Sequence, residues 1–413
     1  MTDLASPPAG NRVPLTATRA ISTFGITVVG FMTANLIPVM ILALGDLGYS
    51  ATGAGTLMTA CLLLSALSCL ATSRWTAKTG RYVVARVGLG LTALGFGTAA
   101  LVPDALIAGI GIILAGLGSG GAVAAGGAAL AALRNPDRAS GISGFTNRAI
   151  VAVVLFIIPA VGIAMGSAFG ILAGLALAAL FTTGWLPDRP AHPIEDPAAQ
   201  ATDVSVKPSR SVTIAGFGLL TCFAIWALGE DSLWAVAAVM GEQQAGLDET
   251  GMGLVLSLST LGGLAAAAVV SAGGNRIGRT IPLVAALLIG AALKISAGFV
   301  TDPQLYLAVI IAWNTIYIVA FLYVVAIAAA LDVTGRWSAP ILGVYLVGSS
   351  FAPLFGTAVS ETFGYQSLGI VLGAISLLLL VPMALISRTS LKVERAAAAH
   401  STPETEFPQA AIA

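Results

Sequence analysis

The sequence predicts an all-α, polytopic membrane protein with twelve transmembrane helices in two pseudo-symmetric halves of six. Three observations carry this prediction: the apolar composition, the number and length of the apolar stretches, and a repeat that relates the two halves. Of the 413 residues, 57% are hydrophobic and only 9% are charged, and the mean hydropathy is +0.95. Soluble domains carry about 25% charged residues, so the composition excludes a soluble globular protein.

Twelve apolar stretches are long enough to cross a membrane as α-helices. A hydrocarbon core of about 30 Å requires about 20 helical residues. The first stretch is longer than the apolar core of a signal peptide, which has about 7–15 residues, so we expect it to span the membrane too. None of the stretches shows the period-two alternation of barrel strands. The expected spans are 20–44, 53–73, 82–102, 105–132, 140–165, 168–186, 212–240, 252–272, 281–300, 305–331, 339–360 and 366–387.

A polar, proline-containing segment separates the first six spans from the last six. Its prolines and mixed charges predict a linker without a hydrophobic core of its own. We therefore expect an N-terminal segment, a six-helix half, the linker, a second six-helix half and a partly disordered tail. These five parts cover residues 1–19, 20–186, 187–211, 212–387 and 388–413.

The basic residues fall on one side of the predicted helices. If both termini lie on the same side, all Lys and Arg residues except Arg148 and Lys294 lie on that side too, whereas the opposite loops contain only acidic charges. Lys and Arg are enriched in cytoplasmic loops, and one missed helix would invert every loop after it. The charge distribution therefore supports twelve spans, with both termini in the cytoplasm and the protein in the plasma or inner membrane.

The two halves repeat each other at a constant offset. The sequence G-Y-S-A-T-G-A-G at 48–55 recurs as G-L-D-E-T-G-M-G at 246–253, which is 198 residues later. The same offset relates Arg81 to Arg279 and continues through loops on both faces of the predicted membrane. Parallel repeats of six helices around a central loop are one of the known transporter architectures.

Related loop motifs follow the second helix of each half. They read S-R-W-T-A-K-T-G-R at 73–81 and S-A-G-G-N-R-I-G-R at 271–279. With the twelve spans, the repeat and the central linker, these motifs make the chain similar to the major facilitator superfamily, whose loop signature is G-x-x-x-D-R-x-G-R. The acidic position is Ala77 in one copy and Asn275 in the other, so the usual acidic contact of the inner gate is missing. The resemblance implies the major-facilitator fold and secondary active transport. It places six residues in cytoplasmic gate loops: Lys78, Gly80, Arg81, Arg276, Gly278 and Arg279.

We expect structural roles for these loop residues. Glycine permits a tight turn, and basic residues keep the loop in the cytoplasm. A different glycine-rich stretch, G-L-G-S-G-G at 116–121, formally matches a nucleotide-binding pattern but lies inside an apolar span. We interpret that stretch as a surface for close helix packing.

Four ionisable residues lie well inside predicted spans: Arg148, Glu230, Asp231 and Lys294. Charges within a membrane are costly, so each of them suggests a functional role with a named partner. For Lys294 we expect its long side chain to reach the outer interface, because the family places the ninth helix at the periphery. A functional role for Lys294 is the alternative.

The two adjacent acids cannot share one helix face. Trp226, Glu230 and Trp234 are spaced at i, i+4 and i+8 and lie on one face, while the next residue, Asp231, points about 100° away. We expect Glu230 to lie between the two indoles and to bind protons or substrate, with Arg148 as its counter-ion, because the resemblance places helices 5 and 7 at the interface between the halves. A static buried pair that fixes helix packing is the alternative.

Asp231 allows two interpretations. It takes part in coupling, or it caps a helix that restarts after a break at Gly229. The resemblance also implies a central cavity lined by helices 1, 4, 7 and 10, to which helix 4 would contribute mainly small residues. For the uncharged members of the cavity, ordinary packing is the alternative. The expected set is Asn35, Trp226, Trp234, Trp313, Asn314 and Tyr317.

Motifs for catalysis or nucleotide hydrolysis are missing from the sequence. It contains no GxxxxGK[ST], HExxH or GxSxG motif, and its three cysteines and two histidines show no metal-binding spacing. We therefore expect neither an enzyme nor a cofactor or metal, and the zero net charge gives no indication of nucleic-acid binding. The expected partners are a small molecule, protons and lipid, and the expected state is a monomer.

The function predicted from these features is proton-coupled efflux of a small organic molecule, aromatic or amphipathic, by alternating access. The tryptophans and Tyr317 near the buried charges favour such a substrate. Two alternatives stay open: proton-coupled uptake of a small organic anion through Arg148, and a transporter-like membrane sensor without net flux.

Overall fold

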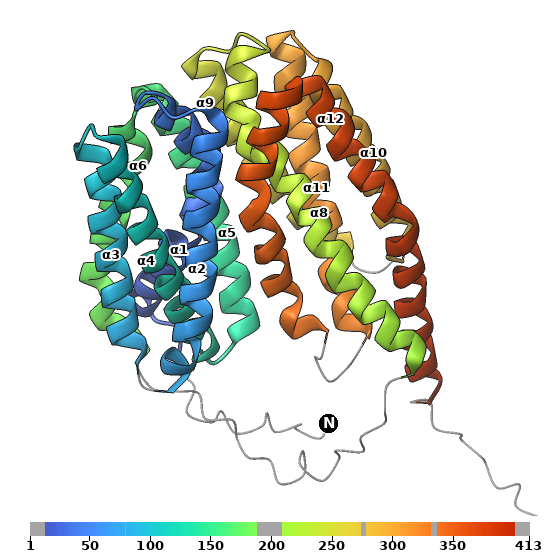
Figure 1. Cartoon of the computed structure of the whole chain (residues 1–413). Coiled ribbons are helices and arrows are strands. Elements are labelled where there is room, and N and C mark those ends of the chain that lie inside the picture. The colour runs from blue at the N-terminus through green and yellow to red at the C-terminus, as the bar shows by residue number, and fades with distance from the viewer. Residues whose placement is uncertain (1–12, 79, 188–208, 274–277, 332–336, 401–413) are drawn as a thin grey trace, which may run out of the picture.

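The computed structural model describes residues 13–78, 80–187, 209–273, 278–331 and 337–400, which form a bundle of long helices (Figure 1). Eleven helices in these ranges are long and apolar enough to span a bilayer. The last of them, α12 (Ser338–His400), has 63 residues, more than twice the length that one span requires. Its backbone is non-helical at Gly364, where the chain turns back. With α12 divided there, the described residues contain twelve spans, and the predicted fold class is confirmed.

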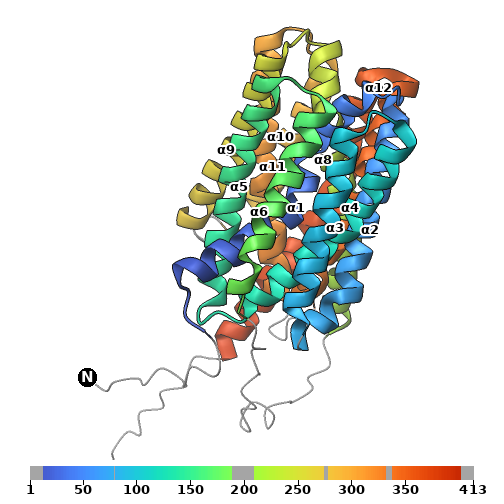
Figure 2. The same cartoon turned by 90° about the vertical axis from the view of Figure 1, so that its left-hand side faces the viewer.

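Two groups of helices lie side by side, one from each half of the chain (Figures 1 and 2). We call the end of the bundle where α1 begins and α12 finishes the terminal end, and the opposite end the distal end. The first half comprises α1 (Ala17–Gly45), α2 (Ala51–Lys78), α3 (Arg81–Leu101), α4 (Ala105–Ala131), α5 (Pro136–Val161), α6 (Met165–Thr182) and the 3-10 turn η1 (Thr183–Trp185). The second half comprises α8 (Arg210–Gln243), α9 (Glu249–Gly273), α10 (Thr280–Phe299), α11 (Pro303–Leu331) and α12.

Local sequence explains where several helices begin and where the chain turns. The side chains of Thr16 and Asp104 accept hydrogen bonds from backbone N–H groups in the first turns of α1 and α4. After α1 and α8 the chain turns at Gly48 (φ 82°) and Gly246 (φ 62°), in the left-handed region that favours glycine. These two glycines are 198 residues apart, so the sequence repeat corresponds to a repeated turn.

Glycines allow the helices to approach closely. A Cβ atom added at Gly95 would lie 2.3 Å from the carbonyl oxygen of Gly111, and one added at Gly120 would lie 2.0 Å from that of Ser65. Such contacts leave no space for any side chain, as is usual where membrane helices associate. Gly120 belongs to the stretch at 116–121, so the interpretation of that stretch as a packing surface is confirmed.

Hydrogen bonds join the two halves in the distal part of the bundle, whereas the ribbons diverge toward the terminal end (Figure 1). In each of these bonds a donor from one half meets an acceptor from the other. The bonds run from Thr52 N to Glu361 Oε2 (2.7 Å), from Ile163 N to Glu249 Oε1 (3.2 Å), from Leu354 N to Thr59 Oγ1 (3.1 Å) and from Trp234 Nε1 to Asn35 O (3.2 Å).

One element differs from a prediction. Helix α8 continues through Gly229 without a break, so Asp231 does not cap a restarted helix. Helix α12 continues to His400, so the segment after residue 387 begins as a helical extension. Most of the predicted linker, 188–208, and the two ends of the chain, 1–12 and 401–413, lie outside the described residues.

Candidate functional site

The adjacent acids of α8 have entirely different surroundings. The side chain of Glu230 points into the second half, and the residue is only 3% exposed, whereas Asp231 is half-buried. The two side chains diverge because neighbouring residues of a helix point about 100° apart. The two adjacent acids therefore differ in their surroundings. Glu230 is enclosed by its own half, and Asp231 is more exposed.

Lys294 of α10 forms an ion pair with Glu230 inside the second half. The lysine is fully buried and also donates a hydrogen bond to Ser376 Oγ of α12, at 2.5 Å. The second carboxylate oxygen of Glu230 accepts a hydrogen bond from Trp313 Nε1 of α11, at 2.7 Å. Helices α8, α10, α11 and α12 thus supply a closed set of partners, as a buried charge pair requires.

Three expectations about this pair are corrected. Lys294 does not reach the outer interface, because its side chain points inward to Glu230 of α8 and Ser376 of α12. The counter-ion of Glu230 is Lys294, and Arg148 forms no ion pair within the described part of the chain. The indole that bonds to Glu230 belongs to Trp313 on another helix, not to Trp226 or Trp234 on α8.

Asp231 is held by a chain of hydroxyl groups. The hydroxyl of Tyr345 in α12 donates to Asp231 Oδ2 at 2.9 Å, and it lies 2.6 Å from the hydroxyl of Tyr317 in α11. Since Tyr345 uses its proton toward Asp231, Tyr317 is the donor in the second bond. Ser349 of α12 lies close enough to Asp231 to interact with its carboxylate. From the other half, Arg148 of α5 interacts electrostatically with Asp231 without forming an ion pair.

The expected cavity residues divide into several environments. Trp226 is almost fully buried and stacks against Tyr317, with ring centroids 5.3 Å apart and planes inclined by 11°. Trp234 meets Asn35 across the interface between the halves, while the amide of Asn35 donates to Phe31 O within α1. Aromatic packing therefore occupies much of the area where the sequence predicted a cavity.

Asn314 is the other amide of the expected set. It is buried, and its Oδ1 atom has no hydrogen-bond partner among the described residues. A Cβ atom added at Gly263 would lie 3.1 Å from this oxygen, so Asn314 faces α9. The structure thus places Asn314 between α9 and α11.

Several contacting residues were not predicted. Tyr345, Ser349 and Ser376 belong to the two spans of α12, which contribute no residue to the predicted site. A signal was present, because Tyr345 and Ser349 lie four residues apart in a largely apolar span and therefore share a helix face.

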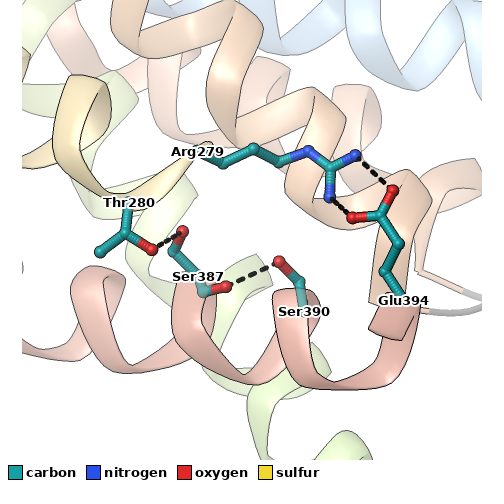
Figure 3. Close-up of polar contacts among 5 residues, drawn as sticks. All are labelled: Arg279, Thr280, Ser387, Ser390 and Glu394. Carbon is teal, nitrogen blue, oxygen red and sulfur yellow. Dashed lines mark hydrogen bonds and ion pairs between the residues drawn. The ribbon is translucent and has the colours of Figure 1, made fainter. Parts of the chain in front are cut away.

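Two arginines of the loop motifs, Arg81 and Arg279, contact other parts of their own halves. Arg81 is buried and donates to the carbonyl oxygens of Thr76 and Pro187, just after η1. Arg279 forms a two-pronged ion pair with Glu394 on the extension of α12, with N–O distances of 2.9 and 3.2 Å (Figure 3). Both arginines therefore connect the motif loop to the chain at the end of the sixth helix of the same half.

The other residues in and next to the two motif loops differ between the halves. Close to Arg279, Thr280 and Ser387 form a hydrogen bond of 2.9 Å, and Ser390 donates to Ser387 O (Figure 3). Gly278 has φ 71°, which favours glycine, whereas Gly80 has φ −92°. Lys78 is the last residue of α2, and Arg276 lies outside the described residues.

Comparison with known proteins supports the same architecture. The chain is similar to a transporter of the POT family solved with 5-aminolevulinic acid (15% identity, 90% of this chain, 96% of that chain, TM-score 0.70). It is also similar to the human organic anion transporter MFSD10 (TETRAN) (15% identity, 92% and 100% covered, TM-score 0.62) and to the nucleoside transporter NupG (11% identity, 88% and 98% covered, TM-score 0.63). Identities this low show the fold alone.

Comparison with family models gives a more specific result. No curated protein matches the chain. The model described as Major Facilitator Superfamily matches residues 22–336, which is most of the sequence. This match agrees with the two six-helix halves and the loop motifs, and the chain belongs to the Major Facilitator Superfamily.

Proposed function

We propose that this protein is a proton-coupled secondary transporter that exports a small organic molecule, aromatic or amphipathic, from the cytoplasm by alternating access. One observation carries the proposal: Asp231 is a half-buried acid that accepts a hydrogen bond from Tyr345 of the second half and interacts electrostatically with Arg148 of the first half. Relative motion of the halves changes the surroundings of such an acid. Alternating exposure of a titratable group is what coupling to protons requires.

Asp231 and Glu230 differ in their charged partners, since Glu230 is paired with Lys294 of its own half and Asp231 is not part of an ion pair among the described residues. All the side chains bonded to Glu230 belong to the second half, so a rigid movement of that half leaves them unchanged. The ion pair with Lys294 therefore serves as a fixed, neutral unit that holds four helices together. The sequence suggested a coupling role for Glu230, and in this proposal its neighbour Asp231 has that role.

Proton and substrate compete for Asp231 in the proposed cycle. In the observed arrangement the halves are joined distally, and substrate reaches Asp231 from the terminal, cytoplasmic side. After the halves rock, a proton from the outside takes the place of the substrate on the carboxylate. The protein then returns to the observed arrangement with the proton bound. Release of the proton into the cytoplasm completes one exchange.

A second candidate is uptake of a small organic anion together with protons. One specific observation favours it: Arg148 is half-buried within the span of α5 and forms no ion pair in the described part of the chain. Its guanidinium group would then bind the anion directly, as arginine binds carboxylates. Asp231 would carry the proton in the same direction.

The direction of proton movement across the membrane distinguishes these two candidate functions. Purified protein is screened by thermal shift against small organic cations, anions and neutral molecules, and compounds that bind are added outside proteoliposomes containing a pH-sensitive dye. Exchange makes the lumen more alkaline, and co-transport makes it more acidic, after correction with protein-free liposomes for passive movement of weak acids and bases. Binding without any flux would contradict both proposals and support a sensor.

A further inference from the structure

The helical extension of α12 beyond its second span has two different sides. The predicted span ends at residue 387, and the helix continues to His400 at the terminal end of the bundle. One side is fixed to the second half: Glu394 pairs with Arg279, and Thr280 and Ser387 form a hydrogen bond (Figure 3). These contacts hold the extension in place, so its other side is available to another molecule.

The other side of the extension is basic. Arg388, Lys392 and Arg395 are spaced at i, i+4 and i+7, so they share one helix face, and all three are exposed. Among the described residues, none of the three forms an ion pair. Glu394 is the one acid between positions 388 and 400 of the sequence, and it points to Arg279 instead. Like charges on successive turns repel each other, so this face lacks the negative charge that would stabilise it.

The basic face continues an apolar stripe of the span. Leu378, Val381 and Leu385 are exposed at intervals of three and four residues, and Leu378 is 76% exposed. Arg388 and Lys392 follow at the same intervals. Exposed apolar side chains on a membrane-spanning helix face acyl chains. These five residues, which we call the outer stripe of α12, therefore form one surface that is apolar within the span and positive where the span ends.

Positions along the helix match the layers of a membrane. A helix rises about 1.5 Å per residue, and the headgroup layer on each side of the hydrocarbon core is roughly 5–8 Å thick. With the hydrocarbon core ending near residue 387, Arg388 lies at its edge and Lys392 lies about 6 Å further out, within the headgroup layer. Arg395 lies about 10 Å out, beyond that layer. A guanidinium and an ammonium group on successive turns are placed to bind one phosphate group.

We infer that the outer stripe of α12 binds an anionic phospholipid. One acyl chain lies along Leu378, Val381 and Leu385, and the phosphate group is bound by Arg388 and Lys392. Two neighbouring cations favour a headgroup with a net negative charge over a zwitterionic one, and attraction to an anionic membrane surface grows with each basic residue. A soluble phosphate compound would use the cations alone and leave the apolar part of the stripe unexplained. The inference goes beyond the proposed transport function and does not depend on it.

A fluorophore on the stripe tests this inference directly. In protein whose native cysteines are replaced by alanine, Leu378→Cys is labelled with bimane and placed in phosphatidylcholine vesicles. These contain a small fraction of phosphatidylglycerol or phosphatidylcholine with brominated acyl chains, which quench a nearby fluorophore. We expect the brominated phosphatidylglycerol to quench several-fold more strongly. The control position is Leu177→Cys, which is also exposed, on α6, the equivalent helix of the first half; there the two lipids should quench nearly equally.

Matched variants test the basic residues. Arg388→Gln/Lys392→Gln should lower the preference for phosphatidylglycerol at Leu378→Cys about fivefold for each charge removed. Arg395→Gln should have a smaller effect because its position lies beyond the headgroup layer. The control Arg134→Gln/Arg138→Gln removes two exposed charges at the same end of the bundle and should leave the preference unchanged.

Three results would overturn the inference. The first is equal quenching by the two lipids at Leu378→Cys, or a preference that survives Arg388→Gln/Lys392→Gln. The second is an equal loss in Arg134→Gln/Arg138→Gln, which would assign the attraction to the positive charge of the whole terminal end. The third is loss of the preference on addition of glycerol 3-phosphate, compared with sodium chloride at the same ionic strength. That loss would identify the basic face as a site for soluble phosphate compounds.

Discussion

Two adjacent carboxylates in α8 show how strongly helix geometry decides the role of a residue. Glu230 is enclosed by Lys294 and Trp313, and Asp231 meets the hydroxyl of Tyr345. Both side chains carry the same carboxylate group, so its chemistry does not explain the different environments. The difference follows from a rotation of about 100° between consecutive side chains, which directs one toward Lys294 and Trp313 and the other toward Tyr345.

The buried ion pair makes a prediction about stability. Lys294→Met would leave Glu230 as an unpaired charge at a site that is 3% exposed, and the loss of folding free energy should be roughly 3–5 kcal/mol. The double variant Glu230→Gln/Lys294→Met removes both charges and should recover most of that loss. Thermal unfolding of the purified proteins in detergent compares the three. A double variant as unstable as the single one would show that the pair itself is not the cause.

At the scale of elements, two carboxylates of the second half hold backbone N–H groups of the first half. Glu361 accepts from Thr52 N and Glu249 accepts from Ile163 N. The contacts use equivalent parts of the repeats, since Ile163 and Glu361 are 198 residues apart. Charged acceptors make stronger hydrogen bonds than neutral ones. The two contacts therefore both hold the halves together at the distal end, one where α2 begins and the other between α5 and α6.

Neutralising both carboxylates should loosen the distal contact. In Glu249→Gln/Glu361→Gln we expect hydrogen exchange to accelerate several-fold at the amides of Thr52 and Ile163, because the acceptors lose their charge. Peptides at the terminal end serve as the internal control and should be unchanged. Unaltered exchange at both amides would show that the distal contact does not depend on the carboxylates.

A glycine at the same interface sets the distance between the halves. A Cβ atom at Gly55 in α2 would lie 2.6 Å from Pro353 O and 2.1 Å from Thr357 Oγ1 in α12. Gly55→Ala should therefore push the distal ends apart, and spin-label distances across α2 and α12 should lengthen. Gly45→Ala is the matched control, because its Cβ atom would meet nothing within 4 Å. Identical distance distributions in both variants would contradict this role.

At the scale of the whole molecule, the charge asymmetry predicts the orientation in the membrane. In a background without native cysteines, Asp46→Cys lies in a distal loop and Arg138→Cys lies at the terminal end, and both positions are exposed. A membrane-impermeant maleimide applied to right-side-out vesicles should label Asp46→Cys alone. Labelling of Arg138→Cys alone would place the termini outside and would reverse the proposed direction of transport.

The sequence predicted the architecture well because hydrophobic length and repeat offset are properties of the chain alone. The contacts of Lys294 could not be predicted in the same way. A helix at the periphery of the bundle still has an inner side, and which of its residues faces inward depends on the rotation of the whole helix. The partners Tyr345 and Ser376 lie on other helices, more than 80 residues from the acids. The unbroken course of α8 likewise depends on packing, which tolerates Gly229 within the helix.

The most direct test of the account compares the two acids in one assay. Proton movement driven by a bound compound is measured in proteoliposomes for Asp231→Asn and for the charge-neutral pair Glu230→Gln/Lys294→Met. We predict that Asp231→Asn loses proton movement while it still exchanges labelled compound for unlabelled, and that the double variant retains both. Proton movement that persists in Asp231→Asn and disappears in the double variant would contradict the central claim.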